Sequence, residues 1–359
     1  MRYMTSGDGR RWESTCRRAW VYIALMVLLG ALVGCGQSSG NSAYGGPQNH
    51  VHDLLALRGF TRTVLLATHY GLYRTTNAGG TWTEVAGGDG QPMDGLMIFK
   101  LAQSPVDSRR VYVLAIPRTG QPGAAKGIPG LYTSANAGQT WTLASSVTAL
   151  PTHTIFSIGA GSAAPGQVYT LIPALGEHGF YVTQDFGAHW SALPPLPDSH
   201  PTGVLGDPNH PGRVLLWSAS SGFYTSADGG QRWTRASGIQ GGIFSVSVAG
   251  STLYASGDAG TYVSADDGGH FILANGAFTF SSVSACPAVP AHAYALTGTT
   301  IYVSTDGART WRPTATTSSH PGGIAVDPAN ANLAYTSFSY PIGVDATTDG
   351  GARWNTVLP

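Results

Sequence analysis

Four histidines recur at similar places along the 359-residue chain: His52, His153, His200 and His320. Each stands two to four residues before a short apolar segment. Imidazole is the commonest metal ligand in proteins, so convergence of these rings would create a metal or anion site. The alternative is that they cap loops through polar contacts. Because they accompany only four of the seven repeats described below, the ring they would form is interrupted. We therefore expect no bound metal and no cofactor.

Carboxylates supply a second possible chemistry, because two acids flanking a glycosidic bond are the minimum for glycoside hydrolysis. Five acids fall in loops that we place on one face of the fold: Asp89, Asp94, Glu177, Asp198 and Asp258. The alternative is that they are ordinary solvated loop side chains. The same loops contain one arginine, Arg118, whose planar guanidinium is a natural partner for a carboxylate.

A repeated octapeptide identifies the elements that position these residues. It reads Ser/Thr, any residue, Asp/Asn, any residue, Gly, two residues and an aromatic, and it occurs seven times. The copies begin at Thr75, Ser134, Thr183, Ser226, Ser264, Ser304 and Thr347. Short β-type segments flank each copy, which indicates a hairpin. Repeats at a period of about 40 residues indicate a solenoid or a propeller.

The acidic or amide position of the repeat is expected to be structural. Its side chain can accept hydrogen bonds from backbone amides a few residues further on, and the Gly allows a conformation that a side chain would obstruct. Seven similar turns cannot all be active sites. The closing aromatic is Trp except at Phe271, and Ala308 replaces the Gly in the sixth copy. The seven acidic or amide residues are Asn77, Asn136, Asp185, Asp228, Asp266, Asp306 and Asp349.

These octapeptides resemble the Asp-box, or bacterial neuraminidase repeat. That repeat is found in sialidases, sortilin-type receptors, xyloglucan-active glycoside hydrolases and photosystem II assembly factors. The resemblance implies an all-β, seven-bladed β-propeller with an Asp-box in each blade, each blade holding four strands, A to D from the centre outward. Because the same box serves enzymes, receptors and assembly factors, it says little about function.

The order of strands divides the candidates between two faces. The A–B and C–D turns, with all the boxes, share one face, which we call the box face. The B–C and D–A loops share the other, which we call the mouth face, and Asp-box enzymes have their active site there. We expect the four histidines in D–A loops. Our candidate ligand-binding residues on this face are His52, Arg118, His153, Glu177, His200, Asp258 and His320. Seven complete blades fit between residues 50 and 359, so no strand need be exchanged between the termini.

The resemblance allows the enzyme classes to be compared with the mouth face. Sialidases clamp their substrate with three arginines, whereas only Arg118 is found here. Xyloglucan-active relatives place a pair of Asp between two tandem propellers, and this chain has one. The insertion at 116–129, with Arg118 and Lys126, and the loop residues Tyr70 and Tyr340 favour recognition instead. We predict a non-catalytic binding or assembly scaffold for a protein or glycan partner. A glycoside hydrolase with two mouth carboxylates is the alternative.

The N-terminus resembles an export signal. Five arginines precede an apolar run at 19–33, and Leu32-Val33-Gly34-Cys35 resembles the lipobox of bacterial lipoproteins. We expect a signal peptide at 1–34, a lipid on Cys35, a Gly/Ser-rich tether at 35–49, and a propeller held outside the cytoplasm by the membrane lipid. The alternatives are an uncleaved membrane anchor or secretion without lipid. Balanced charge, with 19 basic and 19 acidic residues, excludes a basic field for nucleic acid.

Overall fold

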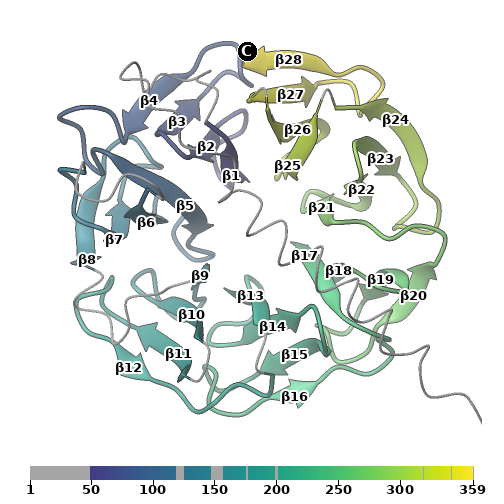
Figure 1. Cartoon of the computed structure of the whole chain (residues 1–359). Coiled ribbons are helices and arrows are strands. Elements are labelled where there is room, and N and C mark those ends of the chain that lie inside the picture. Colours follow the sequence, from purple (N-terminus) through teal and green to yellow (C-terminus); the bar gives the residue numbers. More distant parts are fainter. Residues whose placement is uncertain are drawn as a thin grey trace, which may run out of the picture.

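The computed structural model describes residues 49–118, 125–146, 157–174, 177–198, 201–317, 319–340 and 342–358. These residues form seven four-stranded antiparallel sheets arranged as blades around a central axis (Figure 1). The fold is therefore the all-β, seven-bladed propeller that the repeats predict. Each sheet contains four consecutive strands in order, so the prediction that no strand is exchanged is confirmed. Within the described ranges, no helix is long and apolar enough to cross a membrane.

The A strands lie nearest the axis: β1 (Val51–Ala56), β5 (Leu96–Gln103), β9 (Ser157–Ala160), β13 (Pro201–Gly206), β17 (Ile243–Ala249), β21 (Ser282–Cys286) and β25 (His320–Asp327). The B strands are β2 (Val64–Thr68), β6 (Val111–Pro117), β10 (Val168–Ala174), β14 (Val214–Ser218), β18 (Thr252–Gly257), β22 (Val289–Thr297) and β26 (Asn330–Ser339).

The C strands are β3 (Leu72–Thr75), β7 (Gly130–Ser134), β11 (Glu177–Thr183), β15 (Gly222–Ser226), β19 (Gly260–Ser264), β23 (Thr300–Ser304) and β27 (Gly343–Thr347). The D strands form the outer rim: β4 (Thr83–Ala86), β8 (Thr142–Ser146), β12 (Ser191–Ala192), β16 (Thr234–Arg235), β20 (Ile272–Asn275), β24 (Arg312–Thr316) and β28 (Asn355–Leu358).

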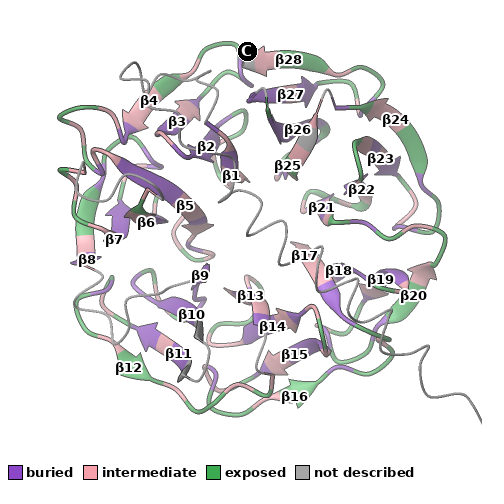
Figure 2. Ribbon diagram, in the orientation of Figure 1, coloured by how far each residue is buried: buried purple, intermediate pink, exposed green. Residues whose placement is uncertain are grey.

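The middle B and C strands are the most buried, the A strands along the axis are mixed, and the rim strands are the most exposed (Figure 2). Both faces of each middle strand pack against neighbouring blades, so these strands read as continuous apolar runs, and all five residues of β2 are buried. The rim strands face solvent on one side, and both residues of β12 are exposed. The hydrophobic core therefore consists of layers between blades, and it leaves the loops at both faces free to vary.

Each box closes its turn through the side chains that the repeat conserves among its copies. In blade 4, the Ser226 hydroxyl donates to Asp228 Oδ1 over 2.8 Å and accepts from the buried amide of Gly230, also over 2.8 Å. Asp228 Oδ1 accepts a further hydrogen bond from the Arg232 amide at 2.9 Å. The Arg232 side chain donates to the same carboxylate, which helps to lower the pKa of Asp228 to about 2. The box therefore contains a self-contained hydrogen-bonded ring.

The other six boxes repeat this arrangement. In every copy Oδ1 of the acidic or amide residue accepts from the backbone amide four residues on, at 2.9 to 3.0 Å: Asn77, Asn136, Asp185, Asp228, Asp266, Asp306 and Asp349. These side chains hold turns, and none of them faces the mouth.

The fourth and fifth positions of each box both have positive φ, which explains the Gly of the pattern. Gly229 and Gly230 have φ of 71° and 94°. A Cβ on Gly230 would lie 2.7 Å from Cε1 of Phe180, so this position needs Gly for space as well as for conformation. In blade 6 the fully buried Ala308 adopts φ 66° instead. The sixth box therefore accepts a conformation that costs an alanine stability.

The ring closes between blades 7 and 1 without a shared sheet. Trp82 Nε1 donates to the carbonyl of Val357 at 3.1 Å, which joins the first box to the last strand. The amide of Arg62 donates to Asp327 Oδ2 at 2.7 Å, and a third bond joins β1 to β26 near the mouth. We call this junction the seam. It is held by side-chain contacts and by apolar packing between the two blades.

Candidate functional site

Three histidines gather at the mouth end of blade 1. His50 and His52 belong to the entry of β1, and His69 follows β2. The register of the two strands shifts between Val51 and Asp53, which makes a β-bulge at His52. Beyond the bulge the pairing continues, because the His69 amide donates to the His50 carbonyl at 3.0 Å. The strand therefore carries all three imidazoles to the mouth.

This register corrects one expectation about the histidines. His52 and His320 were expected in D–A loops, but they lie within β1 and β25. The reason is that a bulge near the start of each strand lets the pairing with the B strand extend one or two residues further towards the mouth. Apolar patterning alone does not reveal such an extension.

The three imidazole rings are in contact. The ring centroids of His50 and His52 are 4.5 Å apart, and those of His50 and His69 are 4.8 Å apart. One ring nitrogen from each of the three lies within 4.8 Å of the other two. Nδ1 of His69 is also 3.1 Å from the sulfur of Met97, at the start of β5. A borderline or soft metal ion would find nitrogen and thioether ligands here.

Aromatic and cationic groups continue the cluster on both sides. Tyr340, in the loop after β26, stacks on His50 with a centroid distance of 5.9 Å. On the other side, Tyr70 packs edge-on against His69 at 4.9 Å, and the Arg118 guanidinium lies 4.7 Å above the Tyr70 ring. Together, these side chains form the mouth cluster: His50, His52, His69, Tyr70, Arg118 and Tyr340.

The mouth cluster is rigid at one end and open at the other. Arg118 Nε donates to the carbonyl of His69 at 3.1 Å, and Nη2 donates to that of Tyr70 at 3.4 Å. His69 is buried, whereas Tyr340 is 52% exposed. A partner would therefore meet the tyrosine first, with the imidazoles beneath it.

Burial decides the charge of the imidazoles. It lowers the pKa of His52 well below its ordinary value, and the neighbouring His50 and His69 add to the effect. Burial, then His50 and Arg118, lowers the pKa of His69 to about 4. Both rings are therefore neutral at neutral pH. Burial also lowers the pKa of Arg118, but a guanidinium keeps its charge in proteins. The cluster therefore offers the Arg118 guanidinium beside the neutral imidazoles of His52 and His69.

The mouth acids whose side chains are described are bound by groups of their own loop or of a neighbouring loop. Asp258 Oδ2 accepts from the amide of Gly242 at 2.7 Å. The hydroxyls of Ser220 and Ser221 donate to Asp198. Asp89 pairs with Lys126 Nζ at 2.5 Å, and Asp94 accepts from the Gly90 amide at 2.8 Å. Asp89 and Asp94 share the loop between β4 and β5, where Lys126 Nζ lies 2.5 and 3.7 Å from their carboxylates, whereas Asp198 and Asp258 lie in loops of other blades.

Several other predicted residues lie beyond this description. Cys35, His153 and His200 fall outside the described residues, as does the middle of the blade 2 insertion. Glu177 was expected in a loop, but it begins β11 and pairs with Ala174, because the strand pairing extends to the end of the β10–β11 hairpin. Of Glu177 and His320, only the backbone of β11 and β25 is described. The described end of the insertion packs on the preceding D–A loop, where the Gly127 amide donates to the Asp94 carbonyl at 2.8 Å.

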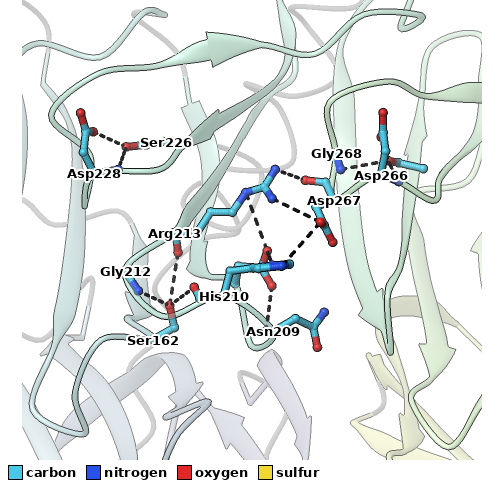
Figure 3. Close-up of polar contacts among 12 residues, drawn as sticks. Ser162, Asn209, His210, Gly212, Arg213, Ser226, Asp228, Asp266, Asp267 and Gly268 are labelled. Atoms are coloured by element: carbon cyan, nitrogen blue, oxygen red, sulfur yellow. Dashed lines mark hydrogen bonds and ion pairs between the residues drawn. The ribbon is translucent and has the colours of Figure 1, made fainter.

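A second cluster of titratable groups lies on the box face (Figure 3). His210 Nδ1 is 3.0 Å from Oδ2 of the buried Asp207, in the A–B turn of blade 4. Arg213 lies between Asp207 and Asp267, with its nitrogens 3.8 and 3.7 Å from their carboxylates. Since Asp267 belongs to the box of blade 5, the guanidinium links the two blades. It already supplies the positive charge that a cation would bring.

Sequence reasoning placed His52, Arg118, Tyr70 and Tyr340 on the mouth face but did not connect them. It missed His50 and His69. His69 directly follows a B strand, so no pattern ahead of an A strand could identify it, and only the β1–β2 register places it beside His50. The available signal was the His-Val-His triplet at 50–52, two imidazoles at the start of a strand.

Comparison with known proteins yields matches in structure only. No family model and no curated protein matches the chain. A GH74 enzyme from Niastella koreensis superposes with a TM-score of 0.68 at 18% identity, covering 90% of this chain and 56% of the enzyme. The GH74 xyloglucanase of Xanthomonas campestris gives a TM-score of 0.64 at 19% identity, covering 86% and 53%. This chain thus spans about half the length of either enzyme.

Two structures of YCF48 also match. YCF48 from Cyanidioschyzon merolae gives a TM-score of 0.55 at 14% identity, covering 85% of this chain and 94% of that protein. YCF48 bound to a D1 peptide gives 0.52 at 15% identity, covering 73% and 81%. At such low identity these likenesses concern the fold alone. The chain is a seven-bladed, Asp-box-type propeller that is structurally similar to both GH74 xyloglucanases and YCF48.

Proposed function

We propose that this protein is a non-catalytic scaffold that binds a protein or glycan partner through the mouth cluster. The observation that carries the proposal is the run of contacting rings from Tyr340 through His50 and His69 to Tyr70, ending under the Arg118 guanidinium. Flat rings with polar edges give large contact area at low conformational cost, and they suit either a sugar ring or a peptide side chain. The comparison with YCF48, one structure of which holds a peptide, supports the same role.

Binding to arrays of peptides and glycans tests this proposal. Replacement of Tyr340 by Ala should weaken partner binding by at least tenfold, because the most exposed ring of the cluster is lost. Ile272→Ala is the matched control, since Ile272 is 66% exposed on the rim strand β20. Binding that responds equally to both replacements, or to neither, would contradict a partner at the mouth cluster.

Glycoside hydrolysis remains the second candidate because of the TM-scores with the GH74 enzymes. Against it stand the contacts of the mouth acids, which bind backbone amides, serine hydroxyls or a lysine. Incubation with xyloglucan oligosaccharides and chromogenic glycosides separates the two functions. Turnover that disappears on Asp94→Asn or Asp258→Asn would establish the enzyme, whereas binding without turnover supports the scaffold.

We further propose that the propeller is tethered outside the cytoplasm by a lipid on Cys35. The support is the lipobox-like Leu32-Val33-Gly34-Cys35 at the end of an apolar run. Buried methylenes contribute about 0.8 kcal/mol each to membrane binding. Mass spectrometry of the native protein should find a lipidated N-terminal Cys35, and Cys35→Ser should release the protein or leave it unprocessed. A mature N-terminus elsewhere would contradict the tether.

A further inference from the structure

We propose that His50, His52 and His69, together with Met97, form a binding site for copper at the mouth of the propeller. The three imidazoles come from two segments of blade 1, and the thioether comes from blade 2. One ring nitrogen of each histidine lies within 4.8 Å of those of the other two, and the sulfur is 3.1 Å from His69 Nδ1. Three nitrogen donors therefore already lie together, and the thioether is in contact with one of the three rings.

A buried imidazole nitrogen without a partner supports the proposal. Nε2 of His52 is inaccessible to solvent and has no hydrogen-bond partner among the described residues. A buried polar atom left in this state costs stability, so nearly all such atoms in folded proteins have a partner. The neighbouring Asn49 is 1% exposed, and its carboxamide oxygen and nitrogen are unpartnered in the same way. A bound ion would satisfy the imidazole directly.

The required adjustment is small. Imidazole nitrogens bind transition metals at about 2.0 to 2.1 Å, so tetrahedral ligands around one ion lie about 3.3 Å apart. The ring nitrogens are now at most 4.8 Å apart, and rotation of the imidazole side chains about their own bonds would bring them to the spacing of ligands around one ion. The backbone is already fixed by the β1–β2 pairing and by the bond between the His69 amide and the His50 carbonyl.

The types of ligand select the metal. Imidazole suits copper, zinc, iron and nickel alike, and carboxylates, which calcium and magnesium prefer, are not among the three residues of the cluster. A thioether is soft and favours Cu(I), and Cu(II) heads the divalent series for nitrogen ligands. The set of three nitrogens and one sulfur therefore fits copper in either oxidation state better than it fits zinc.

The other cluster of potential ligands serves as an internal comparison. Asp207, His210 and Asp267 also bring three donor atoms together. There, however, Arg213 lies against both carboxylates, and a metal ion would have to displace it. In the mouth cluster, the guanidinium of Arg118 instead binds two backbone carbonyls and the Tyr70 ring. Arg118 therefore does not bridge the donor atoms as Arg213 does, although its charge lies near enough to help lower the pKa of His69.

Titration of the purified, untagged protein with Cu(II), with Cu(I) under reducing conditions, and with Zn(II) tests the proposal. We expect one copper per chain, with an electron paramagnetic resonance spectrum of Cu(II) split by nitrogen ligands. His52→Ala and His69→Ala should each weaken copper binding by about 10- to 100-fold or more. Met97→Leu should weaken the binding of Cu(I) more than that of Zn(II). His270→Ala, which removes an exposed histidine of the box face, should leave copper binding unchanged.

Unfolding curves recorded on every variant identify those that retain the native fold, and only these are compared. Absence of stoichiometric copper binding by the unmodified chain would overturn the proposal. So would binding that survives both histidine replacements, or binding of zinc without copper. If Met97→Leu weakens Cu(I) and Zn(II) binding equally, the thioether is not a ligand. The proposed site of three imidazoles and one thioether is then refuted.

Discussion

Acidification should destabilise the propeller through His69. The pKa of this buried imidazole falls from 6.5 to about 4, first through burial and then through His50 and Arg118. The unfolded chain therefore takes up the proton before the folded chain does. The contribution of His69 to stability is complete above pH 6.5 and is lost as pH falls from there towards 4.

The linkage relation gives the size of the effect. Between about pH 7 and about pH 5, the lowered pKa of His69 should remove about 2 kcal/mol from the free energy of unfolding. The loss should reach about 3 kcal/mol once His69 is protonated in both the folded and the unfolded chain. His69 is 7% exposed, so solvent screens this shift little. His52 acts in the same direction because its pKa is also lowered. The carboxylate pKa values that the boxes lower, such as that of Asp228, affect stability only at more acidic pH.

Urea unfolding followed by tryptophan fluorescence at the two pH values measures the effect, with a chelator present to keep metal ions from the imidazoles. His69→Gln should abolish about 2 kcal/mol of the pH dependence, whatever its effect on stability at neutral pH. His270→Gln, on the box face, should keep the wild-type dependence. If His69→Gln loses as much stability on acidification as the wild type does, His69 is not the titrating group and the burial argument fails.

Four further replacements test the boxes by urea unfolding. Ser226→Ala should cost about 1 to 3 kcal/mol, because the buried amide of Gly230 loses its acceptor. Gly230→Ala should cost about 1 to 3 kcal/mol or more from backbone strain and from the clash with Phe180, whereas Ala308→Gly should be nearly neutral, since relief of strain offsets the lost methyl contact. Trp233→Ala should cost about 3 kcal/mol, near the lower end for a large aromatic, because its ring is only partly buried against Phe180. Equal effects of Gly230→Ala and Ala308→Gly would contradict the strain argument.

The fold could be predicted because its determinants are local and repeated. Each box carries its own hydrogen-bonded ring within eight residues, so seven copies predict seven hairpins without any knowledge of contacts between blades. The positive φ at the fourth box position could not be read in the same way. Ala78, Phe186 and Asp267 adopt it there, and no shared residue type marks it.

The candidate site could be predicted only in part, because its members are distant in sequence. Tyr340 and Arg118 were expected at the mouth because of their positions in loops. Which side chains touch there is decided by the contact between blades 7 and 1 and by the bulge at His52. For the mouth acids, the sequence indicated the residue types but not their contacts. Their types suggested hydrolysis, while their contacts, such as that of Asp258 with the Gly242 amide, depend on loop geometry that no spacing encodes.

The position of the mouth cluster on the seam has a consequence for the order in which the protein is synthesised and folds. Val51 and Ser339, whose bond closes the ring beside the cluster, are 288 residues apart. Contacts between such distant segments form late in folding. A ribosome would therefore release the histidines of blade 1 long before Tyr340 exists, and the recognition surface would be assembled by the last docking step. Any partner that requires both halves can distinguish finished molecules from unfinished ones, and by bridging the two blades it would hold the ring shut.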